Sequence, residues 1–168
     1  MASVTMRGNA QQLNGELPQV GAPAPDFTLV ANDMTPVSLA DSNGKVRIIS
    51  VVPSIDTSVC SLETARFNRE LDSMPDNVLG YTVSIDTPFA QKRWCGAEGV
   101  EKMQLLSDFK GATFARAYGV YIENLGISAR AVFVVDRDGK IAYTQLVPEI
   151  SQEPNYQEVL QKAKELAA

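Results

Sequence analysis

The segment from residue 48 to residue 60 constrains the fold more than any other part of the chain. Ile48–Val52 is apolar and largely β-branched, which predicts a buried strand. Pro53 has no N–H to offer a neighbouring strand, so the strand is expected to end there. Residues 56–58 (Asp, Thr, Ser) are three successive N-cap candidates, and apolar residues then recur at helical spacing over 58–74. The segment therefore predicts a strand followed at once by a helix.

Cys60 falls in the first turn of this expected helix, at the end of the strand. Backbone N–H groups and the positive end of the helix macrodipole favour a thiolate there over a neutral thiol. Thr57 lies one turn earlier on the same face, and its hydroxyl can donate toward the sulfur or accept from what the sulfur attacks. These features predict a nucleophile. The alternative is that Cys60 is only a small buried apolar side chain.

The chain contains no histidine and only two cysteines. Without histidine there can be no Ser-His-Asp or Cys-His hydrolase, no His-ligated metal and no His-held haem. Two cysteines do not make a structural disulfide scaffold, and they are too few for a zinc site. We therefore expect no cofactor. Any catalysis is expected to use sulfur, carboxylates, hydroxyls, lysine or arginine.

The length of 168 residues predicts a single domain over 1–168, and 45% hydrophobic with 21% charged residues is ordinary for a globular protein. The net charge of −5 argues against nucleic acid and against anionic membrane surfaces as partners. No stretch approaches the roughly 18 apolar residues of a membrane span. The N-terminal residues lack the apolar core of a signal peptide, so a cytoplasmic location is expected.

Residues 1–18 are expected to form a β-hairpin extension, with Gly8-Asn9 joining Ser3–Arg7 to Ala10–Leu13. Later patterns alternate between strand and helix, which predicts one central sheet with helices on both faces. The site is expected at the carboxyl ends of its strands. Further strands are expected at 27–30, 78–85, 103–106, 131–135 and 140–147, helices at 89–95 (stopped by Gly96), 113–118 and 154–166, and a loop at 119–126.

Pro53-x-x-x-Thr57-x-x-Cys60 is the signature of the peroxiredoxins, and the chain resembles their bacterial thiol peroxidase subfamily. The similarity extends through Phe89-Ala90-Gln91-x-Arg93-x-Cys95-Gly96-Ala97-Glu98-Gly99 and Ala129-Arg130-Ala131-Val132. It implies an α/β, thioredoxin-like fold with a mixed central sheet flanked by helices. It also implies a peroxidase that reduces hydrogen peroxide and organic hydroperoxides.

The resemblance implies a role for five residues. Cys60 would be the peroxidatic cysteine, and Thr57 would hydrogen-bond the sulfur and the peroxide. Arg130 would be the cationic partner, for which the alternative is a surface salt bridge, and Pro53 would shield the pocket. Cys95 would be the resolving cysteine, which forms an intramolecular disulfide with Cys60. The family further implies thioredoxin as the reductant and a homodimer.

In the expected mechanism the thiolate attacks one peroxide oxygen and becomes a sulfenic acid, which condenses with a thiol. Because both cysteines lie on helices that can be far apart, we expect local unwinding, made easy by Gly96 and Gly99. Trp94 would then change its environment, and its fluorescence would differ between the reduced and oxidised protein. The alternative for Trp94 is simple core packing.

Three other functions compete with this interpretation. Cys60-x₅-Arg66 formally matches the phosphate loop of cysteine phosphatases, but that loop needs glycines, whereas residues 62–65 favour a helix. A non-enzymatic thioredoxin-like binding module or holdase would leave both cysteines without a role. A general disulfide oxidoreductase is disfavoured because there is no Cys-x-x-Cys.

Overall fold

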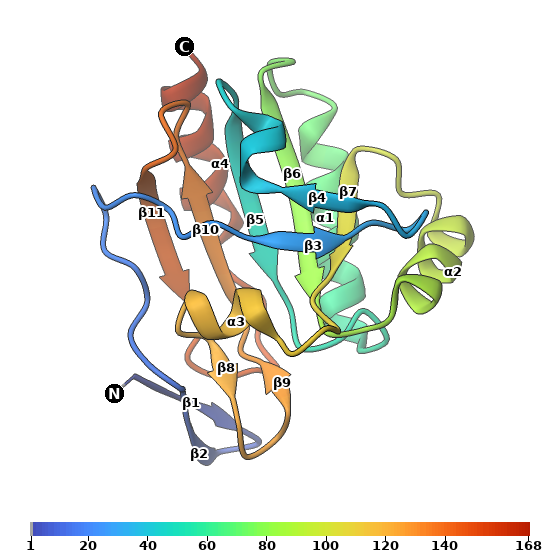
Figure 1. Ribbon diagram of the computed structural model, residues 1–168, viewed down its shortest axis with the longest axis vertical. Coiled ribbons are helices and arrows are strands. Elements are labelled where there is room, and N and C mark those ends of the chain that lie inside the picture. The colour runs from blue at the N-terminus through green and yellow to red at the C-terminus, as the bar shows by residue number, and fades with distance from the viewer. Residues whose placement is uncertain (1) are drawn as a thin grey trace.

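The computed structural model describes residues 2–168, and its centre is a seven-stranded mixed sheet (Figure 1). The strands of this sheet are β3 (Thr28–Val30), β4 (Pro36–Ser38), β5 (Val46–Val51), β6 (Val78–Ser84), β7 (Met103–Ser107), β10 (Ala131–Val135) and β11 (Ile141–Leu146). Their spatial order is β11-β10-β5-β6-β7-β3-β4. β5, β6 and β7 are parallel, and the other neighbours pair antiparallel. The expected mixed α/β sheet is confirmed.

Helices cover both faces of the sheet, as expected. The helices are η1 (Leu39–Ser42, 3₁₀), α1 (Ser58–Leu71), α2 (Pro88–Glu98), α3 (Thr113–Ala117) and α4 (Tyr156–Ala167). Phe67 of α1, Trp94 of α2 and Val159 of α4 pack in one core. Phe114 of α3 packs in the other core, together with N-terminal residues such as Phe27. None of the helices formed by residues 2–168 combines the length and apolar character that a membrane span needs.

β5 and β10 are buried along their whole lengths because each has a strand on both sides and a core on both faces. Successive side chains of a strand point to opposite faces. Ile48 accordingly packs in the core of α1, and Ile49 packs in the core of α3. Two hydrophobic cores therefore hold β5 in place, and with it the turn that follows its carboxyl end.

The N-terminal hairpin forms, but its turn lies one residue earlier than expected. β1 (Ser3–Met6) pairs with β2 (Asn9–Gln12), and Arg7 and Gly8 form the turn in place of Gly8-Asn9. A two-residue hairpin turn of this hand needs positive φ at both positions, and Arg7 (φ 52°) and Gly8 (φ 82°) supply it. The hairpin packs on a distant segment, since the Thr5 amide donates to the Pro148 carbonyl at 2.7 Å.

α2 is longer than the sequence suggests, and Gly96 does not end it. The helix continues to Glu98 and ends at Gly99, which has the left-handed φ of 67°. A glycine inside a helix costs only about 1 kcal/mol, so packing of the flanking residues overrides it. Cys95 therefore lies within the last turns of an intact helix. α1, in turn, ends at Leu71 rather than at 74.

Three short strands and the 3₁₀ helix η1 were missed by the sequence patterns. β8 (Tyr121–Ile122) and β9 (Ile127–Ser128) pair within and beside the expected loop 119–126, and β4 extends the sheet edge. Strands of two or three residues are too short to show an alternating pattern. The remaining elements lie within two residues of their expected bounds.

Candidate active site

Cys60 is the third residue of α1, directly beyond the carboxyl end of β5, and it is fully buried. Of the three cap candidates, Thr57 is the N-cap, and its Oγ1 accepts from the Cys60 amide at 3.3 Å. The Thr57 hydroxyl itself donates to the Ser54 carbonyl at 3.3 Å. In this structure Thr57 therefore positions the backbone of the cysteine, while its proton points to the preceding turn and not to the sulfur.

Arg130 lies immediately before β10 and is only 1% exposed, so it is not a surface salt bridge. Its Nη1 donates to Glu63 Oε1 at 3.1 Å, and its Nε donates to the Ile150 carbonyl at 2.9 Å. Glu63 is also fully buried and accepts a second hydrogen bond from the Ser50 hydroxyl. The two ends of the guanidinium are thus fixed by a helix side chain and by a loop carbonyl.

Glu63 was missed as a site residue by the sequence reasoning. It lies three positions after Cys60, which places it on the same face of α1. Burial raises its pKa to about 7, although the charge of Arg130 and the hydrogen bond from Ser50 act in the opposite direction. The charge of the buried pair therefore changes close to neutral pH.

A cavity of about 330 Å³ opens beside the turn before α1. Pro53, Thr57 and Arg130 all line it, so the structure brings these three predicted site residues together. Its other walls come from the hairpin, from β9 and from the loop 149–151, and include the side chains of Met6, Val59, Ile127 and Ile150. Apolar walls strengthen the field of a charged group such as Arg130 on any molecule bound there.

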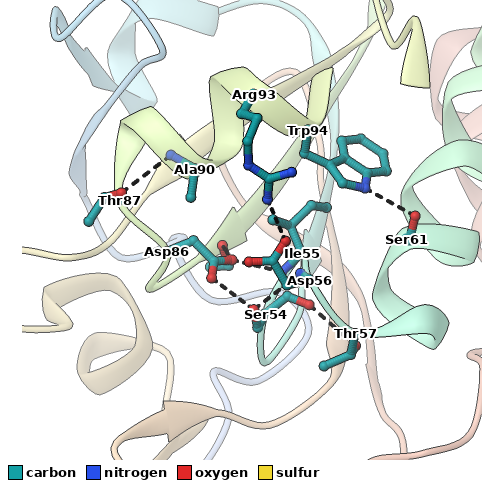
Figure 2. Close-up of polar contacts among 11 residues, drawn as sticks. Ser54, Ile55, Asp56, Thr57, Ser61, Asp86, Thr87, Ala90, Arg93 and Trp94 are labelled. Atoms are coloured by element: carbon teal, nitrogen blue, oxygen red, sulfur yellow. Dashed lines mark hydrogen bonds and ion pairs between the residues drawn. The ribbon is translucent and has the colours of Figure 1, made fainter. Parts of the chain in front are cut away.

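Two side-chain contacts join α2 to the segment around Cys60 (Figure 2). Arg93 donates to Asp56 at 2.8 Å in an exposed ion pair. Trp94 donates its indole N–H to the Ser61 hydroxyl at 3.0 Å, and the ring is 5% exposed within a core. Trp94 is thus packed in the core and also in contact with the residue after Cys60.

Cys95 lies apart from these residues. It lines a second, more polar hollow of about 550 Å³, between the β3–β4 turn and the segment before β7. Asn32 Nδ2 donates to its sulfur at 3.7 Å, and burial raises the pKa of its thiol. Both cysteines are free, so this is the dithiol form of the protein.

The phosphatase alternative is wrong on geometry. Arg66 is part of α1, where it pairs with Glu70 at 3.2 Å and lies over the ring of Tyr156 at 4.6 Å. Residues 60–66 form a continuous helix, so they make no loop that could wrap around a phosphate.

Comparisons with known proteins give a consistent result. Residues 19–160 match the family model described as Redoxin. The chain is 49% identical to the thiol peroxidase of Bacillus subtilis over 166 residues, 99% of each protein. It is also 49% identical to that of Halalkalibacterium halodurans, over 98% of each. A peroxiredoxin-like protein from Aquifex aeolicus has a TM-score of 0.93 and 42% identity, over 99% of this chain and 98% of that one.

Proposed function

The chain belongs to the Redoxin family and, within it, to the thiol peroxidases, and from this premise we propose that Cys60 attacks the hydroperoxide. One observation carries the assignment. Cys60 lies in the capped first turn of α1 and directly follows Thr57, Ser58 and Val59, which line the cavity together with Pro53 and Arg130. The Cys60 side chain is itself buried and is not part of the lining. Among the described residues Cys95 has no comparable surroundings, which supports Cys60 as the first of the two cysteines to react.

In the first step the Cys60 thiolate attacks one oxygen of the hydroperoxide. A sulfur–oxygen bond forms, the oxygen–oxygen bond breaks, and the far oxygen leaves with the bonding pair and takes up a proton. Arg130 stabilises the negative charge that moves to the leaving oxygen, and its fork can address two atoms at once. Glu63 accepts a hydrogen bond from Arg130 and so fixes the position of the guanidinium. Pro53 and the apolar wall keep water from the reacting atoms.

In the second step the Cys95 sulfur attacks the Cys60 sulfenic acid, water leaves, and a disulfide forms. A disulfide requires Cα atoms about 4.4–6.8 Å apart. Because Cys95 lines the separate hollow, α2 has to move first, and the Arg93–Asp56 and Trp94–Ser61 contacts are the ones that part. An external dithiol, thioredoxin, then reduces the disulfide and restores both thiols.

Further proposals concern partners and organisation. The substrates are hydrogen peroxide and organic hydroperoxides, the second supported by the apolar lining of the cavity. The active form is a homodimer, with neither nucleic acid nor membrane as a partner. The location is the cytoplasm, a reducing compartment in which the disulfide of each cycle can be returned to two thiols. Residues 1–168 act as one domain, in which the hairpin extension (1–18) contributes Met6 and Arg7 to the cavity.

Stopped-flow measurement of peroxide consumption tests this function. We expect rapid consumption of hydrogen peroxide and of an organic hydroperoxide, and continuous turnover only when thioredoxin and its reductase are added. A binding module or holdase predicts no consumption of either peroxide. Turnover at the same rate without thioredoxin would contradict the proposed reductant.

A further inference from the structure

Asp86 lies two residues beyond the end of β6, the strand that runs parallel to β5. Its carboxylate accepts from the Ser54 hydroxyl at 2.8 Å and from the Ile55 amide at 2.7 Å (Figure 2). It also accepts from the Ser84 hydroxyl at 2.6 Å. One carboxylate therefore joins the end of β6 to the turn between Pro53 and α1.

The turn held by Asp86 leads directly to the reacting cysteine. The Ser54 carbonyl accepts the Thr57 hydroxyl, and Thr57 Oγ1 accepts the Cys60 amide, both at 3.3 Å. A continuous series of hydrogen bonds thus runs from Asp86 through the turn and the N-cap to the first turn of α1. A shift of Ser54 moves the Thr57 hydroxyl, because the two groups are bonded to each other.

The turn depends on Asp86 because the sheet no longer supports it. β5 ends at Val51, so Ser54 and Ile55 lie outside the strand ladder, and Pro53 has no N–H to donate. Asp86 is itself fixed, since its carbonyl accepts the Ser107 hydroxyl from the end of the next strand. The carboxylate therefore ties this segment to the end of β6, in addition to the burial of the Ile55 side chain in the core.

We propose that Asp86 is a positioning residue for the peroxide reaction. It holds the Ser54–Ile55 turn so that the Thr57 hydroxyl and the Cys60 sulfur meet the two peroxide oxygens in line. It touches neither the sulfur nor the substrate. The inference rests on the proposed function, in which Cys60 is the attacking group.

The chain offers a matched control for the removal of a strand-end carboxylate. Asp108 follows β7 as Asp86 follows β6, and it accepts from the amides of Phe114 and Ala115 at 3.0 and 2.9 Å. It supports the start of α3 and makes no contact with the turn before Cys60. Asp108→Ala therefore shows how much the loss of any strand-end carboxylate changes the reaction rates of Cys60.

The experiment compares two reactions of Cys60 in a Cys95→Ser background, where only the first step proceeds. One is sulfenic acid formation with hydrogen peroxide, which needs in-line geometry, and the other is alkylation by iodoacetamide, which does not. Misplacement of reacting groups by about 1 Å can cost about 10²-fold in rate, and we expect a loss of this size for Asp86→Ala. The rate at which iodoacetamide alkylates Asp86→Ala should stay close to that of the background protein. Both reaction rates of Asp108→Ala should also stay close to it.

Two further variants make the test decisive. Asp86→Asn should recover most of the peroxide rate, since its carbonyl can accept from Ile55 and its amide can donate to the Ser54 oxygen. Ser54→Ala removes one of the three contacts of the Asp86 carboxylate, together with the 3.2 Å hydrogen bond from the Asp56 amide to the Ser54 hydroxyl. A smaller selective loss of the peroxide rate is expected even if Asp86→Ala does not fold.

The inference is overturned if Asp86→Ala matches Asp108→Ala, or if the peroxide and alkylation rates fall together. If Asp86→Ala does not fold, an unchanged peroxide rate in Ser54→Ala overturns it. If the Cys95→Ser background forms no sulfenic acid at Cys60, the proposed function fails, and the inference fails with it.

Discussion

The surroundings of the two cysteines differ in almost every respect. Cys60 is the third residue of α1, is fully buried, and has its amide capped by Thr57. Cys95 is the eighth of eleven residues in α2, is only partly buried, and is hydrogen-bonded by Asn32. Helix N-termini favour an anion and helix C-termini disfavour one. The position on a helix thus distinguishes the two sulfurs, and it supports the proposed roles of Cys60 as the attacking and Cys95 as the resolving cysteine.

The two regions also differ in how firmly they are held. On the inner face of α1, one turn after Cys60, Glu63 is buried and hydrogen-bonded to Ser50 of β5 and to the buried Arg130. Around Cys95 the helix contains Gly96 and ends at Gly99, and the contact of Arg93 with Asp56, in the turn before α1, is exposed. Regions with exposed contacts open at lower free energy than buried ones. One region is suited to fixed geometry, and the other is suited to movement.

The largest effect is expected from exchanging each sulfur for oxygen. Cys60→Ser should abolish peroxide consumption, because Cys95, the other cysteine of the chain, lines a separate hollow. Cys95→Ser should react once and accumulate sulfenic acid, which a dimedone adduct detected by mass spectrometry would show. If Cys95→Ser loses the first step, the roles assigned to the two cysteines are wrong.

The next effect concerns the buried cation. Arg130→Met is best made together with Glu63→Gln, because Arg130→Met alone would leave a buried unpaired carboxylate. The double variant should lose about 10²–10³-fold in kcat/KM, as is typical when a group that stabilises transition-state charge is removed. The Glu63→Gln single variant is the control. Equal rates for the single and the double variant would exclude Arg130 from the mechanism.

The hydroxyl at position 57 should matter less. Thr57→Val removes both the N-cap and the donor, so its peroxide rate should fall by about tenfold or more relative to Thr57→Ser. Thr57→Ser keeps the oxygen and should retain most of the rate. If both variants react equally fast in stopped-flow measurements, the hydroxyl has no part in the reaction.

Movement around Cys95 should be visible in Trp94. Its indole now donates to Ser61 inside a core, so unwinding of α2 on oxidation would expose the ring to water. We expect a shifted and altered emission spectrum in the oxidised protein, reversed by dithiothreitol. A Cys95→Ser control should show no such change, and superimposable spectra in the wild type would count against unwinding.

The smallest effect is a pH dependence of stability. The pKa of Glu63 is raised from 4.5 to about 7 in the folded protein, so the folded state binds this proton more tightly than the unfolded chain. Its contribution is fully present below pH 4.5 and is lost as the pH rises to about 7. Across this window the free energy of unfolding should fall more steeply for the wild type than for Glu63→Gln. Parallel denaturation curves would contradict the raised pKa.

The central strands and the cysteine turn could be predicted from sequence because their signals are local. The apolar run before Pro53, the cap at Thr57 and the turn after Val135 each specify structure within a few residues. The candidate reactive residues at the start of α1, Thr57 and Cys60, could be found in the same way. The motif added Arg130, which lies far away in sequence.

Residues whose role depends on distant segments could not be found in this way. Glu63 looks like one more charge on a solvated helix face until Arg130, 67 positions later, is packed against it. Asp86 looks like an ordinary turn residue until β5 and β6 place it beside Ser54. Gly96 looks like the end of a helix in the sequence. The packing of Trp94 in the core, which helps the helix to continue past Gly96, depends on distant residues and leaves no local pattern.

The N-terminal hairpin has a practical consequence for anyone producing this protein. Met6 and Arg7 form part of the cavity rim, and Glu149 holds the hairpin there through Thr5 and Gly8. Figure 1 shows the hairpin and the C-terminal end of α4 on opposite sides of the molecule. An affinity tag fused ahead of β1 would be attached to the hairpin that forms this rim, whereas one appended after α4 would be attached to an element that does not line the cavity.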